Sequence, residues 1–162
     1  MDGIYTVSFF GHRVVQRFDD ADGAVYGLIC ALLREKERLD FLVGFGGDFN
    51  NIVSAAVRRA RKAVRDDTAT LTLVLPYENA ATRKDSNLLL QYYDAIEVDV
   101  LADTSYFKAA YSVRNRRVID RSDLCVFYVE RESGGAYAAL CYARKKGKGI
   151  INFAENMKRL QD

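Results

Sequence analysis

The stretch RNRRVIDRSDLCVFYVERESGGAYAALCYARKKGKGIINF, Arg114 to Phe153, indicates how this chain folds. Its centre is a continuous apolar run from Leu124 to Val129, which is typical of a strand buried on both faces. A polar turn and two glycines follow, then a helix with small apolar residues on one side and a last strand, Gly149 to Phe153. Strand, turn, helix and strand in this order normally form a right-handed parallel unit.

The same alternation runs through the rest of the chain. Strands are expected at Ile4–Phe10, Phe41–Val43, Thr70–Leu75 and the half-exposed edge Asp94–Val100. Helices are expected at Asp19–Arg38, Asp48–Arg65, Ser105–Arg121 and from about Ala154, and within the polar segment Glu78–Gln91. The pattern predicts an α/β, Rossmann-like three-layer fold with a mostly parallel central sheet and helices on both faces.

Composition narrows the class of protein. The 162 residues carry 24 basic and 22 acidic side chains, a net charge of +2, which supports neither a nucleic-acid nor a membrane partner on global grounds. One proline and the absence of a linker predict a single domain over residues 1–162, and no signal segment or membrane span is seen, so we expect a cytoplasmic protein. Cys30, Cys125 and Cys141 lack metal spacing and are expected to be small buried residues; no metal or cofactor is predicted.

Three turns are expected at the carboxyl ends of the strands, where ligands bind in parallel α/β sheets. They are Gly11-His12-Arg13, Gly44 to Asp48, and Ser133-Gly134-Gly135. The second and third precede helices, whose free N–H groups and dipole attract phosphate, and Asp48 is expected to cap its helix. Alternatively, each glycine turn only meets a backbone requirement. Neither turn is a Walker A loop or a dinucleotide fingerprint.

Several side chains near these turns have two interpretations. His12, the only histidine, contacts a ligand or makes a structural hydrogen bond. Arg13 clamps a phosphate or forms a surface ion pair. Tyr77 stacks on a base or packs at the rim. Arg114 shares a helix face with Phe107 and Tyr111 and is expected to point inward, where a phosphate or Asp123 would balance its charge. The basic residues from Arg58 to Arg65 are interpreted as a solvated face.

Taken together, these motifs resemble the SLOG superfamily, which includes the LOG (lonely guy) phosphoribohydrolases, the DNA-processing protein A family and, most similar here, the YpsA-like proteins. The matching motifs are SFFGHR at Ser8–Arg13, GFGGDFN at Gly44–Asn50, VLPYEN at Val74–Asn79, YD at Tyr93-Asp94, RNRRVIDRSD at Arg114–Asp123 and ESGGAYAALCYARKKGK at Glu132–Lys148. The resemblance implies that Leu124–Val129 pairs with the first strand, that Asp94–Val100 lies outside the third, and that a nucleotide-like ligand binds in one shared pocket.

One departure from the LOG pattern bears on catalysis. The LOG motif Pro-Gly-Gly-x-Gly-Thr-x-x-Glu carries a glutamate needed for glycosidic cleavage, and its last three defined positions fall here on Tyr137, Ala138 and Cys141. A thiol cannot replace the carboxylate. The Arg-Lys pair of the LOG family is also replaced, by Arg114-Asn115. A carboxylate from elsewhere, such as Asp48 or Glu132, would be needed for hydrolysis.

The sequence therefore predicts a module that binds or senses a nucleotide or a related phosphorylated ligand. Nucleoside 5'-monophosphate hydrolysis of the LOG kind and single-stranded DNA binding of the DNA-processing protein A kind are the alternatives, and no catalytic residue is located. A homodimer or larger assembly is expected, with Phe107, Tyr111 and Tyr137 as candidate surface. The predicted ligand site comprises Gly11, His12, Arg13, Gly44, Gly46, Gly47, Asp48, Tyr77, Arg114, Asn115, Ser133, Gly134 and Gly135.

Overall fold

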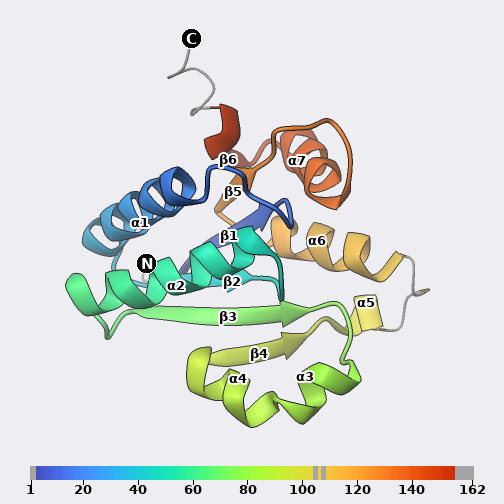
Figure 1. Cartoon of the computed structure of the whole chain (residues 1–162), viewed down its shortest axis with the longest axis horizontal. Helices are drawn as coiled ribbons and strands as arrows, with labels where there is room; N and C mark the ends of the chain where they lie inside the picture. The colour runs from blue at the N-terminus through green and yellow to red at the C-terminus, as the bar shows by residue number, and fades with distance from the viewer. Residues whose placement is uncertain (1–2, 104–105, 107–108, 156–162) are drawn as a thin grey trace.

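Strands and helices alternate along the computed structural model, which describes residues 3–103, 106 and 109–155 (Figure 1). The elements in chain order are β1 (Tyr5–Gly11), α1 (Phe18–Glu35), β2 (Leu39–Val43), α2 (Asp48–Ala63), β3 (Ala69–Leu75), α3 (Ala80–Lys84), α4 (Ser86–Tyr92), β4 (Ala95–Val98), α5 (Val100–Asp103), α6 (Ala110–Asp120), β5 (Leu124–Tyr128), α7 (Gly135–Lys145) and β6 (Gly149–Asn152). The predicted alternation is confirmed, with most boundaries shifted by a few residues.

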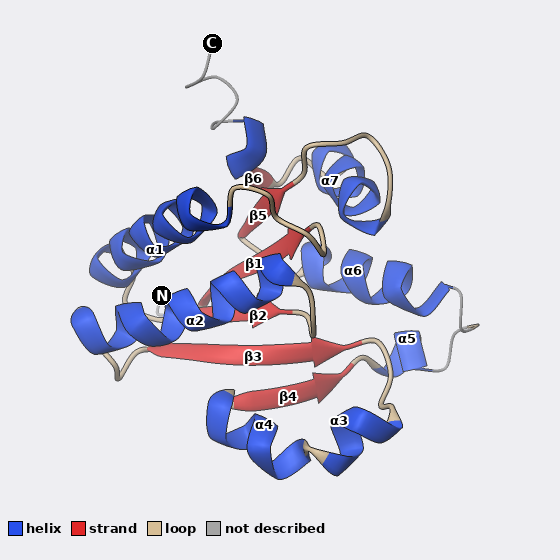
Figure 2. Ribbon diagram, viewed as in Figure 1, coloured by secondary structure: helices blue, strands red, loops and turns tan. Residues whose placement is uncertain are grey.

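The strands form one sheet in the order β4-β3-β2-β1-β5-β6, and every neighbouring pair is parallel. The expected pairing of the central strand with the first is confirmed, because Phe9 of β1 lies opposite Val126 of β5. The strand after α4 is also the outer neighbour of β3, as expected. The carboxyl ends of all strands, the arrowheads in Figure 2, therefore lie on the same side of the sheet, and the turns that follow the strands lie close together there.

Two apolar layers cover the sheet, because successive residues of each strand point to opposite faces. Val7 and Phe9 of β1 pack with apolar residues of α1 and α2. Phe10 belongs to the opposite layer, with residues of α6 and α7. The two short helices α3 and α4 lie beside β4, at the edge of the sheet (Figure 2). The predicted Rossmann-like three-layer architecture is confirmed.

The segment between β4 and β5 differs most from the prediction. The strand expected to reach Val100 ends at Val98, because the Asp99 Oδ1 accepts a hydrogen bond of 2.9 Å from the Ala102 N–H and starts a helical turn. The helix expected from Ser105 begins, as α6, only at Ala110. Phe107 lies outside the described residues.

Three further expectations concern the cysteines, the end of the chain and membrane spans. Cys30 and Cys125 are buried as expected, whereas Cys141 is exposed on α7, so its expected burial is wrong. The helix expected from about Ala154 is seen only as far as Glu155, where the described residues end. Within residues 3–103 and 109–155, no helix is long and apolar enough to cross a membrane.

Candidate functional site

A cavity of about 400 Å³ lies at the carboxyl edge of the sheet, within the range of about 300–1,000 Å³ usual for ligand pockets. Its walls come from the end of β1, the β2–α2 loop, the end of β3, one side of α6 and the β5–α7 loop. After β1 the chain proceeds outward to β2, whereas β5 lies on the other side of β1. The cavity therefore occupies the crevice where strand order reverses, which is the usual ligand position in this architecture.

Most of the predicted ligand residues share this cavity, although they come from five separate segments. Those in its walls are Gly11, His12, Arg13, Gly44, Gly46, Tyr77, Arg114, Asn115, Gly134 and Gly135. Gly47, Asp48 and Ser133 do not line it. Ligand contact by any of these residues stays a prediction.

Gly11 and His12, at the end of β1, have structural roles that the structure makes explicit. A Cβ at Gly11 would lie 2.5 Å from the Cβ of Phe49, so glycine is required there by packing. The Nε2 of His12 accepts a hydrogen bond of 3.0 Å from the Glu130 N–H and thereby holds the β5–α7 loop. This contact assigns the neutral ring with its proton on Nδ1. The structural interpretation of His12 is therefore supported, and its imidazole still faces the cavity.

We expect the His12 pKa to lie below the usual 6.5, because burial and the nearby charge of Arg131 both disfavour the imidazolium. The stabilisation from this neutral histidine is then complete above about pH 6.5 and is lost as the pH falls toward the folded-state pKa. Proton NMR can follow this single imidazole directly. When the pH is lowered from 7.5 to 5.5, the melting temperature of His12→Gln should fall less than that of the wild type. A His12 pKa above 6.5 would contradict the assigned hydrogen bond.

The α2 amino terminus differs from the predicted phosphate cradle. The N-cap is Gly47, with φ +85°, and Asp48 is the first helical residue, so the predicted cap is wrong. The Asp48 N–H donates to the Arg13 carbonyl oxygen at 2.8 Å, and its Oδ2 accepts from the Val15 N–H at 2.9 Å. This helix end binds the chain that follows β1, which leaves it poorly placed for an anion.

The amino terminus of α7 is open. Gly134 is its N-cap, with φ +90°, and no atom lies within 4 Å of a Cβ placed on Gly134 or Gly135. No side chain of a described residue caps this helix, and its first turn contains no acidic residue. The N–H groups of Gly135, Ala136 and Tyr137 have no protein acceptor among the described residues. Of the two predicted helix-end sites, α7 is therefore the one that faces the cavity with free donors.

Arg114 points inward from α6, as predicted, and is 4% exposed. Its Nε donates to the Val74 carbonyl oxygen and its Nη1 to Asn115 Oδ1, both at 2.9 Å. Its Nη2 has no partner among the described residues. Asp123 is not its counter-ion, contrary to one alternative, because the Asp123 carboxylate accepts from the Thr6 N–H at the start of β1.

Burial, reinforced by the charge of Arg121, lowers the pKa of Arg114 to about 10. The guanidinium is therefore still charged at neutral pH. It forms no ion pair with a described carboxylate, and it lies in the cavity wall beside Gly44. A buried charge without a counter-ion is unfavourable, so an anion in the cavity would stabilise it.

Aromatic and polar residues complete the cavity. Several of them were not among the predicted ligand residues. Tyr77 and Tyr111 meet edge to face, with ring centroids 5.8 Å apart. Asn50 accepts from the Gly44 N–H and donates to the Gly46 carbonyl oxygen, so it shapes the β2–α2 loop. Asn79 and Arg131 also line the cavity. Asn50 and Asn79 lie inside two of the motifs that carry the family resemblance, and those motifs could have identified them. No local sequence pattern distinguished Arg131 as a ligand residue.

Acidic groups are missing from the cavity wall, as far as the described residues extend. Asp48 and Glu132, the suggested substitutes for the LOG glutamate, do not line it. Cys141 is exposed farther along α7. The described residues also contain no cluster of histidine, cysteine or carboxylate side chains that could hold a metal ion. The walls supply donors and a positive charge, a composition suited to binding an anion.

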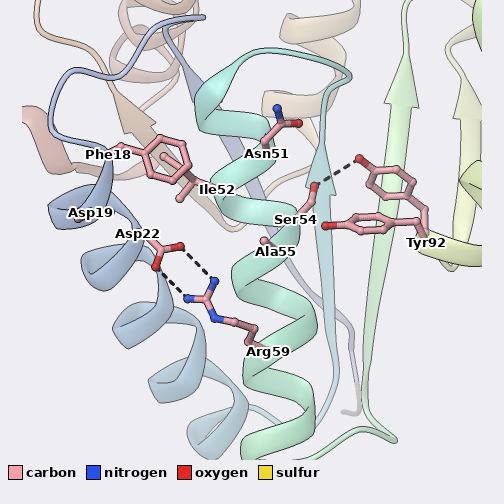
Figure 3. A pocket seen from close by; sticks show the side chains of 10 residues that line it. Phe18, Asp19, Asp22, Asn51, Ile52, Ser54, Ala55, Arg59 and Tyr92 are labelled. Atoms are coloured by element: carbon pink, nitrogen blue, oxygen red, sulfur yellow. Dashed lines mark hydrogen bonds and ion pairs between the residues drawn. The ribbon is translucent and has the colours of Figure 1, made fainter.

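A second cavity, of about 590 Å³, lies between α1, α2 and α4 (Figure 3). Its cation is already paired, because Arg59 of α2 reaches Asp22 of α1 with two hydrogen bonds of 3.0 and 3.2 Å. On the same helix, Arg61 pairs with Asp66 and Asp94. On the predicted basic face of α2, Arg59 and Arg61 are thus paired with carboxylates, as expected of a solvated face.

Comparison with models of known protein families and with curated proteins finds no match. Among solved structures, DNA processing protein A from Helicobacter pylori is similar, with a TM-score of 0.65 and 15% identity over 92% of this chain and 65% of that one. DNA processing protein A from Streptococcus pneumoniae is similar with a TM-score of 0.63 and 13% identity, over 91% of this chain and 49% of that one. This chain therefore spans only part of either protein, and the likeness shows a shared fold.

Proposed function

We propose that the cavity binds the phosphate of a nucleotide or nucleotide-like ligand and that the protein acts as a ligand-binding module. The observation that carries this proposal is Arg114, a buried guanidinium in the cavity wall with an unpartnered Nη2 and no carboxylate counter-ion among the described residues. A phosphate would balance that charge in a poorly solvated place, where electrostatic attraction is strong.

The other walls suit the rest of a nucleotide. The free N–H groups at the start of α7 are donors for phosphate oxygens. The Tyr77–Tyr111 pair presents aromatic surface for a base, and Asn79 and Asn115 offer amides for polar edges. A volume of about 400 Å³ holds a small ligand of this kind.

Single-stranded DNA is a second candidate, and the comparisons support it more directly than they support a free nucleotide. The structure of the Helicobacter pylori protein was described for its single-stranded DNA binding mode. In this chain the cations available to a strand at the cavity are Arg13 and Arg131, both exposed and without an ion pair to a described residue. A strand would then enter the same cavity with one of its nucleotides.

We expect a nucleoside 5'-monophosphate to raise the melting temperature. Ligand at a hundred times its Kd adds about 2.7 kcal/mol, which corresponds to several degrees for a domain of this size. Thermal shift with the nucleoside and with inorganic phosphate as separate controls measures this. Affinity for oligonucleotides that falls steeply with salt, without affinity for mononucleotides, would instead support the strand. Release of free base from the monophosphate would contradict a purely binding role.

Self-association also remains a proposal. Of the surface suggested for it, Tyr111 is exposed but lines the cavity, and Tyr137 is half-buried at the start of α7. A dimer built on these residues would therefore lie directly beside the ligand.

A further inference from the structure

We infer that the cavity takes two phosphate groups joined through one nucleoside, as in a nucleoside 3',5'-bisphosphate or one step of a nucleic-acid strand. This inference rests on the proposed nucleotide site and specifies its ligand. It is based on two separate sets of anion donors that lie on opposite sides of the same cavity.

The first set lies over the β2–α2 loop and combines a buried and an exposed arginine. The Nη2 of Arg114 lies 3.6 Å from the position of a Cβ on Gly44. The Nη2 of Arg13 lies 3.7 Å from the corresponding position on Gly46. Burial raises the pKa of the Tyr111 hydroxyl, and the nearby charges of Arg13 and Arg114 both partly oppose that rise. The two guanidinium groups thus converge on one region of positive potential.

The second set lies at the start of α7. The N–H groups of Gly135 and Ala136 have no acceptor among the described residues, and no described atom lies within 4 Å of a Cβ placed on Gly134 or Gly135. Arg131, in the preceding loop, lines the same cavity and is exposed, with no ion pair to a described residue. Its charge reaches His12, whose pKa it helps to lower. A helix end with free donors and an adjacent arginine favours a phosphate.

One phosphate cannot occupy both places. The Nη2 atoms of Arg114 and Arg13 lie against Gly44 and Gly46 in the turn after β2, whereas the second set lies in the turn after β5, and β1 lies between these two strands. The turns after β2 and β5 are therefore two strand spacings, or about 10 Å, apart. Phe10, which lines the cavity, lies between the two sets. Its ring centroid is 5.8 Å from the Arg114 Cζ, and it belongs to one apolar cluster with Ala139 and Leu140 of α7. A hydrogen bond joins atoms about 3 Å apart, so donors at this separation require two anionic groups.

The phosphates must also be separated in the ligand. In a nucleoside 5'-diphosphate they share one oxygen and reach a single set of donors. In a 3',5'-bisphosphate, and between neighbouring nucleotides of a strand, a sugar lies between them. The second arrangement fits the two donor sets, and the Tyr77–Tyr111 pair lines the same cavity as an aromatic surface for the base.

Two isomers test this inference, because adenosine 5'-diphosphate and adenosine 3',5'-bisphosphate contain the same atoms. Calorimetric titration should show the bisphosphate binding about tenfold more tightly than the diphosphate. Arg13→Gln and Arg131→Gln, which alter exposed side chains, should each remove that preference. Arg144→Gln, an exposed change of the same charge at the far end of α7, should keep it.

The possible failures are distinct. If neither isomer binds, the proposed nucleotide site is wrong. If both bind equally, or if only one of the two arginines contributes to the preference, a single phosphate position exists and the inference is overturned while the proposed function stands. A 5'-phosphorylated dinucleotide identifies the source: tighter binding than the bisphosphate indicates a strand, and weaker binding indicates a small bisphosphate.

Discussion

Replacing Arg114 by methionine is expected to weaken nucleotide binding about a hundredfold, because a charge-assisted hydrogen bond contributes about 1.5–3 kcal/mol and each 1.4 kcal/mol is a factor of ten. The fold should change little. The variant loses a hydrogen bond to the Val74 carbonyl oxygen but also removes a buried charge that has no counter-ion among the described residues. We therefore expect the free energy of unfolding without ligand to stay within about 1 kcal/mol of the wild type.

Calorimetry of nucleotide binding and chemical unfolding of the free protein measure the two effects separately. Arg116→Met is the matched control, since Arg116 lies two residues away on α6 but is exposed and outside the cavity. Strong destabilisation with unchanged affinity would show that Arg114 serves the fold and would remove the main support for the proposed site.

Adding one methyl group at Gly11 should have the largest effect on stability. The new Cβ would lie 2.5 Å from the Cβ of Phe49, which is fully buried and attached to the first turn of α2. Overpacking of this kind costs about 1–3 kcal/mol. For a chain of this length, Gly11→Ala should lower the melting temperature by roughly 3–10 °C.

Gly135→Ala is the comparison, because no atom lies within 4 Å of a Cβ there and alanine favours helix more than glycine does by about 1 kcal/mol. It should unfold at the same temperature as the wild type or above it. The contact can be isolated by repeating Gly11→Ala in a Phe49→Gly background, which removes both the Phe49 Cβ and its ring, so the added methyl group should be tolerated there. Equal destabilisation in both backgrounds would show that the packing argument is wrong.

The pattern of residues was sufficient to predict the layers of this protein. A buried strand is continuously apolar and a covering helix repeats its apolar residues every three or four positions, so β5, α1 and α2 could be recognised locally. Parallel pairing followed from the helices between the strands. The inward direction of Arg114 was also predicted, from the helix face that it shares with Tyr111, although in the structure Tyr111 is exposed and it is Val118, four residues after Arg114, that is buried.

The boundaries after β4 were less predictable. The alternation of polar and apolar residues extended past Val98, but the Asp99 side chain offered the backbone a helical turn instead. Such competition between a side chain and the strand ladder depends on one hydrogen bond, which hydrophobic periodicity does not report.

The sequence by itself determined which turns would meet at the carboxyl edge of the sheet, because strand order and helix periodicity are properties of local segments. Only the tertiary structure decided which of those turns offers free donors. The glycine turns before α2 and α7 have the same pattern, but the carbonyl oxygen of Arg13, far away in the chain, accepts a hydrogen bond from the first N–H of α2, whereas the start of α7 stays open. Whether a donor is free depends on every group that folding brings near it, and that information is not contained in the turn.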